Sequence, residues 1–237
     1  EQYRDKLPPE VFTQPFKLPV YDTPKASREN LRKAFDLFKQ AGWENREGKL
    51  VNAKTGEPFR IEFLGDDPTD ERITGPFMDN LRRLGIDASL RIVDQTQYIN
   101  RVNNFDYDII TQVLAQSQSP GNEQRDFWGS EAADQQGSRN LIGIKDPIVD
   151  ELIGKIVTAH SREDLIAACR ALDRVLLWSY YVIPQWHNRV TRIAYWAKLR
   201  HPETWPRYGV DLFAWWVDPA QATAVEAARR DLAPPAN

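Results

Sequence analysis

A pattern of strand, helix and strand between residues 59 and 92 constrains the fold of this 237-residue chain more than any other feature. Residues 59–63 alternate between apolar and polar side chains, as in a β-strand with one buried face. Apolar side chains then recur at helical spacing, namely Ile73, Phe77, Leu81 and Leu84. Gly85 ends that helix, and a second strand follows at residues 90–92. Strands joined in this way lie in one sheet, so the pattern predicts an α/β fold.

Further signals predict the elements around this sheet. Ser27 can cap a helix with one apolar face, and Gly42 ends that helix. Turns at Gly48 and at residues 52–56 indicate a hairpin whose second arm enters the sheet. A short helix is expected at residues 98–102.

Two more helices are predicted in the second half of the chain. Asp146 can serve as an N-cap with Pro147 at the first helical position, which suits a residue that lacks a backbone N–H. Ser161 and Asp164 have the spacing of a capping box at the start of the next helix. We expect both helices to pack against the sheet.

The most informative segment is an apolar strand that runs directly into a polar loop. Five of the eight residues at 107–114 are apolar, a pattern that we interpret as a strand covered on both faces, and residues 115–128 follow as a loop. Ligands of open α/β sheets collect beyond the carboxyl ends of strands, so this loop is the predicted binding site. The candidate ligand-binding residues are Gln112, Gln116, Ser117, Gln118, Ser119, Asn122, Arg125, Trp128 and Asn140.

Each candidate residue type has a physical role in this prediction. The amides and hydroxyls can exchange hydrogen bonds with a peptide backbone without carrying charge. Arg125 could bind a carboxylate, and Trp128 could stack on a ligand side chain. The alternative is that the polar groups satisfy one another and that Phe127 and Trp128 belong to the core.

Composition excludes several classes of partner. The formal net charge is -3, and the arginines are scattered among acids, so no basic surface is expected for nucleic acid. No apolar run approaches the roughly 20 residues of a transmembrane helix. Residues 1–6 lack the apolar segment of a signal peptide.

Nothing in the sequence predicts a metal, a cofactor or an enzyme. His160, His187, His201 and Cys169 show no close pairing of the kind that binds zinc. Cys169 is expected to be a buried small side chain, although a hydrolase using Cys169 with His187 is an alternative. The acids at residues 66–71 are interpreted as a solvated helix start.

Short motifs in a fixed order carry a resemblance to a known family. They are Ala-Gly-Trp at residues 41–43, Leu-x-x-Leu-Gly-Ile at 81–86, the Phe-Asp before the strand at 105–106, and Pro-x-Val-Asp-x-Leu-Ile at 147–153. Together they resemble extracellular solute-binding protein family 5, whose members serve peptide and nickel importers. The segment at residues 119–128 is similar to the YejA-like branch of that family. The resemblance covers about residues 30–184.

The resemblance implies a fold and a function. The fold would be a lobe of a type II periplasmic binding protein, a mixed sheet flanked by helices, with a C-terminal tail that belongs to the other lobe. The function would be to bind an oligopeptide or peptide-like solute in the periplasm by two-lobe closure, and to present it to the membrane subunits of an ABC permease. The chain would then be the C-terminal part of a longer protein.

The sequence departs from the family pattern at one functional position. Peptide-binding relatives that anchor a free amine carry Trp-x-x-Asp before the loop, whereas this chain has Ser117 and Pro120 at the two matched positions. The carboxylate that would pair with an ammonium group is therefore missing there. This departure favours a ligand with a blocked or differently anchored end, although Glu123 or Asp126 could substitute.

The resemblance also implies a division of the chain. Residues 1–26, which contain five prolines, would be an extended connector, and residues 27–184 would form the ligand-binding lobe. Residues 185–220 would be a Trp-rich return segment with β-type runs around Ile193, Tyr195 and Trp196, and 221–237 a short helix followed by a disordered tail from residue 231. The rival interpretation is a free-standing interaction domain that docks a partner, or self-associates, through exposed aromatic side chains of this tail.

Overall fold

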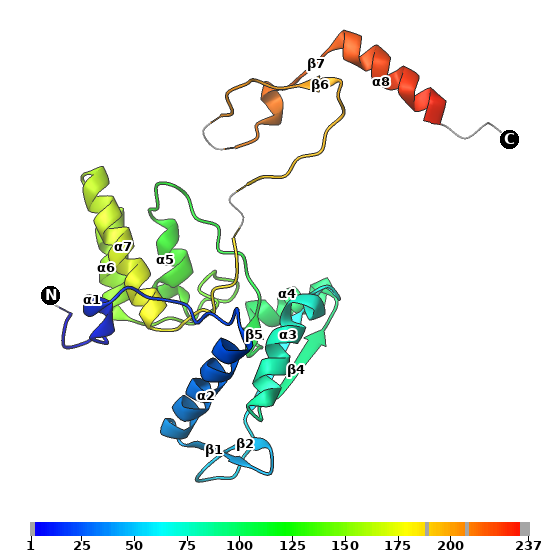
Figure 1. Ribbon diagram of the computed structural model, residues 1–237. Helices are drawn as coiled ribbons and strands as arrows, with labels where there is room; N and C mark the ends of the chain where they lie inside the picture. Colours follow the sequence, from blue (N-terminus) through cyan, green and yellow to red (C-terminus); the bar gives the residue numbers. More distant parts are fainter. Residues whose placement is uncertain (1–2, 188–189, 207–208, 233–237) are drawn as a thin grey trace. The chain divides into compact units, whose positions relative to one another are not determined.

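The computed structural model describes residues 3–187, 190–206 and 209–232 of the chain (Figure 1). It divides the chain into two compact units. The first unit comprises residues Glu1–Val182, and the second unit comprises residues Ile183–Asn237.

Three parallel strands form the sheet of the first unit. β3 (Arg60–Gly65) lies between β4 (Asp87–Ile92) and β5 (Ile109–Ile110) and is parallel to both. α3 (Asp70–Arg83) connects β3 to β4, which confirms the predicted strand, helix, strand unit. The predicted short helix is also present as α4 (Gln95–Asn103), which precedes β5.

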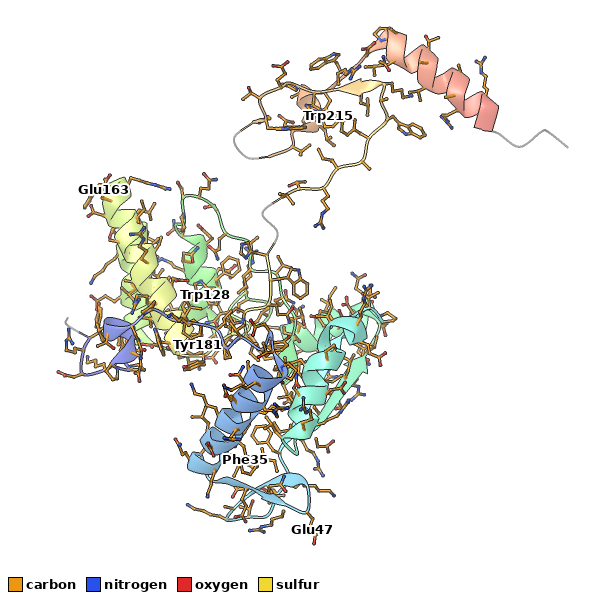
Figure 2. The ribbon with its side chains drawn as sticks, in the orientation of Figure 1. Phe35, Glu47, Trp128, Glu163, Tyr181 and Trp215 are labelled. Atoms are coloured by element: carbon orange, nitrogen blue, oxygen red, sulfur yellow. The ribbon has the colours of Figure 1, made fainter. Side chains whose placement is uncertain are left out.

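An apolar core packs between this sheet and its helices. Its buried residues are Leu50, Phe63, Met78, Leu84, Ile86 and Ala88. α2 (Pro24–Gln40) contributes half-buried side chains to it, among them Phe35, which Figure 2 labels. The predicted cap of α2 is wrong, because Thr23 rather than Ser27 is the N-cap and its Oγ1 accepts a hydrogen bond from the Ala26 N–H at 3.1 Å.

The buried face of α3 differs by one residue from the predicted one. Thr74 and Met78 are buried, whereas Ile73 and Phe77 are 38% and 37% exposed. Both sets of residues recur at helical spacing, so the sequence does not decide which face of the helix is buried. The position of the sheet core decides it. The prediction was therefore right about the helix and wrong about Ile73 and Phe77.

A separate hairpin precedes the sheet. β1 (Trp43–Arg46) and β2 (Lys49–Asn52) pair in antiparallel fashion around Glu47 and Gly48, both of which have positive φ. Gly85, at the end of α3, packs on this hairpin: its carbonyl accepts from the Leu50 N–H, and a Cβ there would lie 2.7 Å from the Leu50 nitrogen. The chain turns back again at residues 52–56, where Val51 and Pro58 form an antiparallel bridge, and the next segment is β3, so the predicted second arm does enter the sheet.

The strand predicted at residues 107–114 is much shorter in the structure. Only Ile109–Ile110 pairs, opposite Phe63 and Leu64. β3 ends one residue later at Gly65, so the chain after Ile110 has no strand beside it to continue the ladder. Val113 is accordingly 88% exposed, and the expected burial on both faces does not occur.

A second core is built from helices. α6 (Pro147–Val157) and α7 (Arg162–Trp178) pack on each other and on α5 (Glu123–Trp128), which Figure 1 shows side by side. The predicted caps are confirmed: Asp146 accepts from the Ile148 N–H at 2.8 Å, and Ser161 accepts from the Asp164 N–H at 3.0 Å. The predicted packing of these helices on the sheet is wrong, because the residues of their core come from the helices, from the segment before α6 and from the N-terminal segment.

The N-terminal segment follows the surface of α7. We expected this segment to lack regular structure, but it contains a short helix, α1 (Glu10–Thr13). Val11 is buried in the helical core. The Arg174 guanidinium, from α7, donates to the Val11 carbonyl at 2.7 Å and to the Gln14 carbonyl at 2.6 Å, which fixes the segment to the helix.

The second unit has little regular structure before its last helix. Two short strands, β6 (Leu199–Arg200) and β7 (Trp216–Val217), are antiparallel, and α8 (Pro219–Leu232) follows them. A short 3-10 helix, η2 (Leu212–Ala214), precedes β7. His201 stacks on Trp205 with ring centroids 4.1 Å apart, and Trp215, labelled in Figure 2, lies beside both rings.

Two predictions for this unit need correction. Ile193, Tyr195 and Trp196 do not lie in strands, since the pairing begins at Leu199. The predicted C-terminal helix is confirmed, but it continues through residues 231 and 232, which were expected to be disordered. The rest of the predicted tail, residues 233–237, lies outside the described residues.

Candidate ligand-binding site

The candidate loop leaves the sheet at the edge where β3 and β5 both end. Because the two strands are parallel, residues 65–66 and 111–112 reach the same edge. There the Gln112 side-chain amide donates to the Tyr98 hydroxyl, from α4, at 3.3 Å. Burial raises the pKa of the Tyr98 phenol, the Gln112 hydrogen bond lowers it, and the carboxylates of Asp66 and Asp70 raise it further.

The start of α3 contributes these acids to the edge. Asp66 and Asp67 are exposed, and Asp67 accepts a hydrogen bond from the Thr69 N–H at 2.8 Å, which lowers the pKa of its carboxyl group. These are the features of a solvated helix start, as the sequence indicated. The structure therefore places a phenol, a neutral amide and carboxylates at the carboxyl edge of the sheet.

A buried glutamine fixes the far end of the loop. Gln124, in α5, is only 4% exposed, and both ends of its amide have partners. Its Nε2 donates to Gln116 Oε1 at 2.7 Å, and its Oε1 accepts from the Trp128 indole N–H at 3.1 Å. Sequence reasoning missed Gln124, although its spacing of four residues from Trp128 on one helix face was a signal for this contact.

A carboxylate holds the turn before α5. Glu123 accepts from the Gly121 N–H at 2.9 Å and from the Gln124 amide at 3.3 Å. Desolvation acts to raise the pKa of this carboxyl group, but these hydrogen bonds and the one from its own N–H outweigh it, so the pKa is lowered overall. Glu123 is therefore ionised at neutral pH, and its carboxylate already accepts hydrogen bonds from Gly121 and Gln124.

Two of the predicted ligand residues have structural roles instead. Trp128 is 8% exposed and lies in the helical core, as Figure 2 shows, with its indole N–H bonded to Gln124. Asn140 is fully buried: its Nδ2 donates to the carbonyls of Gly129 and Ile144, and its Oδ1 accepts from the Ile144 N–H. Neither side chain can reach a ligand from these positions, and we leave both out of the candidate site.

The other seven predicted residues are all exposed. They are Gln112, Gln116, Ser117, Gln118, Ser119, Asn122 and Arg125. Ser117 Oγ accepts from the Ser119 N–H at 3.2 Å, so the loop also bonds within itself. The exposed Val113 adds an apolar side chain that no periodicity in the sequence could have identified, because the pattern placed it in a covered strand.

A hollow of about 570 Å³ lies elsewhere in the first unit, between the N-terminal segment and helices α6 and α7. Its walls are mainly apolar and include Leu7, Phe12 and Ala171. None of the nine predicted ligand residues lines it. We place the candidate site at the loop rather than here, because the loop offers exposed polar groups at the carboxyl edge of a parallel sheet.

Two kinds of reactive centre can be checked among the described residues, a metal cluster and a cysteine nucleophile. Among them no group of three or more His, Cys, Asp or Glu side chains could hold a metal ion. Burial raises the pKa of the Cys169 thiol, the Arg162 charge lowers it, and Glu123 raises it, with a net increase. Such a shift disfavours the thiolate that a nucleophile requires. No described helix is long and apolar enough to cross a membrane.

Comparisons with known proteins give the chain relatives and a family. The sequence profile of the bacterial extracellular solute-binding proteins, family 5 Middle, matches residues 4–136. The chain is 49% identical over 217 residues to the probable peptide-binding protein YejA of Agrobacterium fabrum, covering 91% of this chain and 35% of that protein. It is 50% identical over 216 residues to the uncharacterized protein y4wM of Sinorhizobium fredii, covering 91% and 33%. The chain thus spans about a third of the length of these relatives.

The fold agrees with these matches. The oligopeptide-binding protein AppA of Bacillus subtilis, solved in complex with a nonapeptide, superimposes with a TM-score of 0.63 at 17% identity, covering 88% of this chain and 40% of that one. This similarity confirms the predicted fold class, a type II periplasmic binding protein lobe, and the identity to YejA confirms the predicted branch. Because the family profile matches more than half of its residues, the chain belongs to family 5 of the bacterial extracellular solute-binding proteins.

Proposed function

We propose that the chain is the solute-binding part of an ABC importer and that it binds an oligopeptide or peptide-like solute in the periplasm. The observation that carries the proposal is the loop at residues 111–122, whose polar side chains are exposed at the carboxyl edge of a parallel sheet. Residues 27–184 would form one lobe, and the segment from 185 would return to another. Closure of two lobes would bury the solute and present it to the permease subunits.

The chemistry of the loop fits a peptide. Amide and hydroxyl groups at Gln112, Ser117, Gln118 and Asn122 can both donate to and accept from backbone N–H and C=O groups. Val113 offers an apolar surface beside them. The names of the peptide-binding relative and of the oligopeptide-binding structure support this class of solute.

The acids near the loop already have partners within the chain. This favours a solute that does not place a free ammonium group at the position where amine-anchoring relatives carry Asp. Ser117 and Pro120 stand where amine-anchoring relatives carry Trp and Asp. The two acids that could substitute already have partners: Glu123 bonds to the Gly121 N–H, and Asp126 accepts from the Arg139 N–H at 3.4 Å and pairs with its guanidinium at 3.9 Å. A blocked or otherwise neutral end would avoid placing an unpaired ammonium here.

An amide NMR titration with matched tripeptides tests the proposal. One set has free N-termini and the other has formyl-blocked N-termini, so the two differ only at that end, which is a charged ammonium in one set and a neutral formamide in the other. We expect chemical-shift changes at residues 112–122, larger with the blocked set. Changes confined to other regions, or none with either set at millimolar concentration, would contradict the proposal.

Exposed aromatic and aliphatic side chains favour a second function, docking of a partner or of a second copy by the second unit. Phe213 is fully exposed, Leu212 is 71% exposed and Trp216 is 53% exposed. Apolar surface of this kind often marks an interaction site. Sedimentation velocity over a range of concentrations decides the self-association case: a dimer that is lost in Phe213→Ser would support it, and a monomer at all concentrations would exclude it.

A further inference from the structure

Arg162 occupies a position that helix electrostatics does not explain. It is the first residue of α7, directly after the N-cap Ser161, and the labelled Glu163 marks this end of the helix in Figure 2. The N-terminus of a helix carries a partial positive charge, so acids such as Glu163 and Asp164 are favoured there and an arginine is not. A contact outside the helix must therefore account for the position of Arg162.

That contact is with the candidate loop, more than forty residues earlier in the sequence. Arg162 Nη1 donates to the Gln118 carbonyl oxygen at 2.8 Å and lies 3.4 Å from Ser119 Oγ. A hydrogen bond from a charged donor is stronger than one between neutral groups. One guanidinium nitrogen thus holds two successive residues of the loop.

The hydrogen bonds from α5 to the loop do not involve Gln118 or Ser119. Gln124 holds Gln116, and Glu123 holds the Gly121 N–H, both from α5. In the described part of the chain, the other hydrogen bond at residues 117–119 is the local one from the Ser119 N–H to Ser117 Oγ. Arg162 is therefore what ties the outermost part of the loop to the helical core.

We propose that Arg162 is a positioning residue for solute binding: it orders residues 117–121 in the free protein, so that a solute meets a loop already in its bound conformation. The inference rests on the proposed function, because it assigns Arg162 to the same site. Ordering a flexible loop opposes binding, and a loop that is ordered beforehand avoids most of that cost. Loss of the contact should therefore weaken binding without removing any group that touches the solute.

Three variants separate this role from a merely structural one. Arg162→Ala removes both contacts, and Arg162→Lys keeps the charge and one flexible donor. Arg170→Ala is the matched control, because Arg170 is an exposed arginine on the same helix. Loop order is measured without solute by {1H}-15N heteronuclear NOE, solute affinity by titration with N-formyl-trialanine, and overall stability by thermal unfolding.

We expect lower NOE values at residues 117–121 in Arg162→Ala, with α7 and the thermal midpoint unchanged. Binding of N-formyl-trialanine should be about tenfold weaker, which corresponds to about 1.4 kcal/mol. Arg162→Lys should recover part of both effects, and Arg170→Ala should behave as the wild type.

Other outcomes would overturn the inference. Unchanged NOE values in Arg162→Ala would show that the contact does not order the loop, and an ordered-to-flexible change with unchanged affinity would show that loop order does not serve binding. An equal loss of order across α6 and α7 would make Arg162 a general packing residue. If the wild type binds none of the peptides, the proposed function fails, while the NOE values still decide whether Arg162 orders the loop.

Discussion

The helical core of the first unit and the whole of the second unit bury side chains to very different extents. Around α6 and α7, eleven apolar residues are buried, and the buried side chains of Asn140 and Gln124 are hydrogen-bonded, Asn140 to the Ile144 backbone and Gln124 to the Trp128 indole N–H. In the second unit no residue whose burial is described is buried. The difference teaches that burial of apolar side chains can drive folding of the first unit, whereas the described part of the second unit has no comparable buried core.

Truncating a buried side chain of the helical core should have the largest effect on the free energy of unfolding. It tests whether the first unit is stabilised by a packed core. Ile153 is 1% exposed in the helical core, so Ile153→Ala should lower the free energy of unfolding by about 3.5 kcal/mol. Urea unfolding followed by far-UV circular dichroism measures it. Ile166→Ala, at a 38% exposed position on α7, is the control and should cost less than about 1 kcal/mol. Equal effects of the two changes would contradict a packed core here.

Removing the buried amide should have the next largest effect. Asn140→Ala leaves the carbonyls of Gly129 and Ile144 and the Ile144 N–H without their partner, and we expect a loss of about 2.5 kcal/mol. The same urea experiment applies. Asn122→Ala, at an exposed position, should stay within about 0.5 kcal/mol of the wild type. A loss below about 1 kcal/mol in Asn140→Ala would show that water replaces the amide.

A large truncation in the second unit should have a much smaller effect on the first. Trp215→Ala would cost about 3–5 kcal/mol in a packed core, but here we expect less than about 1 kcal/mol for the main urea transition. The reason is that the tryptophan contacts Tyr195, His201 and Trp205 of its own unit, where none of the residues with described burial is buried. A loss comparable to that of Ile153→Ala would break the comparison.

The smallest effect is expected at Glu123 and depends on pH. Its folded-state pKa is lowered relative to the usual value near 4.3, so its contribution to stability is present above that value and is lost as the pH falls through the folded-state pKa. The stability difference between wild type and Glu123→Gln should therefore shrink between pH 6 and pH 3. A difference that is constant over this range would mean that the carboxylate charge does not hold the turn.

Local signals in the sequence were sufficient for the fold class and for the longer helices, but not for α1 or for α5, which lies in the segment predicted as a loop. The cap formed by Asp146 with Pro147 involves residues within one helical turn. The strand, helix, strand pattern of residues 59–92 is likewise visible in the spacing of apolar residues that are close in the sequence. The phase of α3 could not be predicted, because Ile73 and Met78 are both apolar and only the sheet core decides which is buried. The length of β5 could not be predicted either, since it is limited by where β3 ends.

The candidate site was predicted in part. The sequence predicted a polar loop after the strand, and the amides of that loop are exposed in the structure; that the loop binds a ligand stays a prediction. It misassigned Trp128 and Asn140, whose burial depends on contacts with Gly129, Ile144 and the helical core. Arg162 was missed entirely, since its partner lies forty-four residues earlier and no local pattern connects the two.

The most direct test of the account is to map where a peptide touches the chain. An N-formylated tripeptide that carries a benzophenone side chain is irradiated with the protein, and the adducts are located by mass spectrometry, with excess unlabelled peptide as the competitor. We predict competed adducts within residues 112–122. Adducts concentrated in the apolar hollow between the N-terminal segment and α7, or spread over the exposed aromatic residues of the second unit, would contradict the assignment of the loop as the solute-binding site.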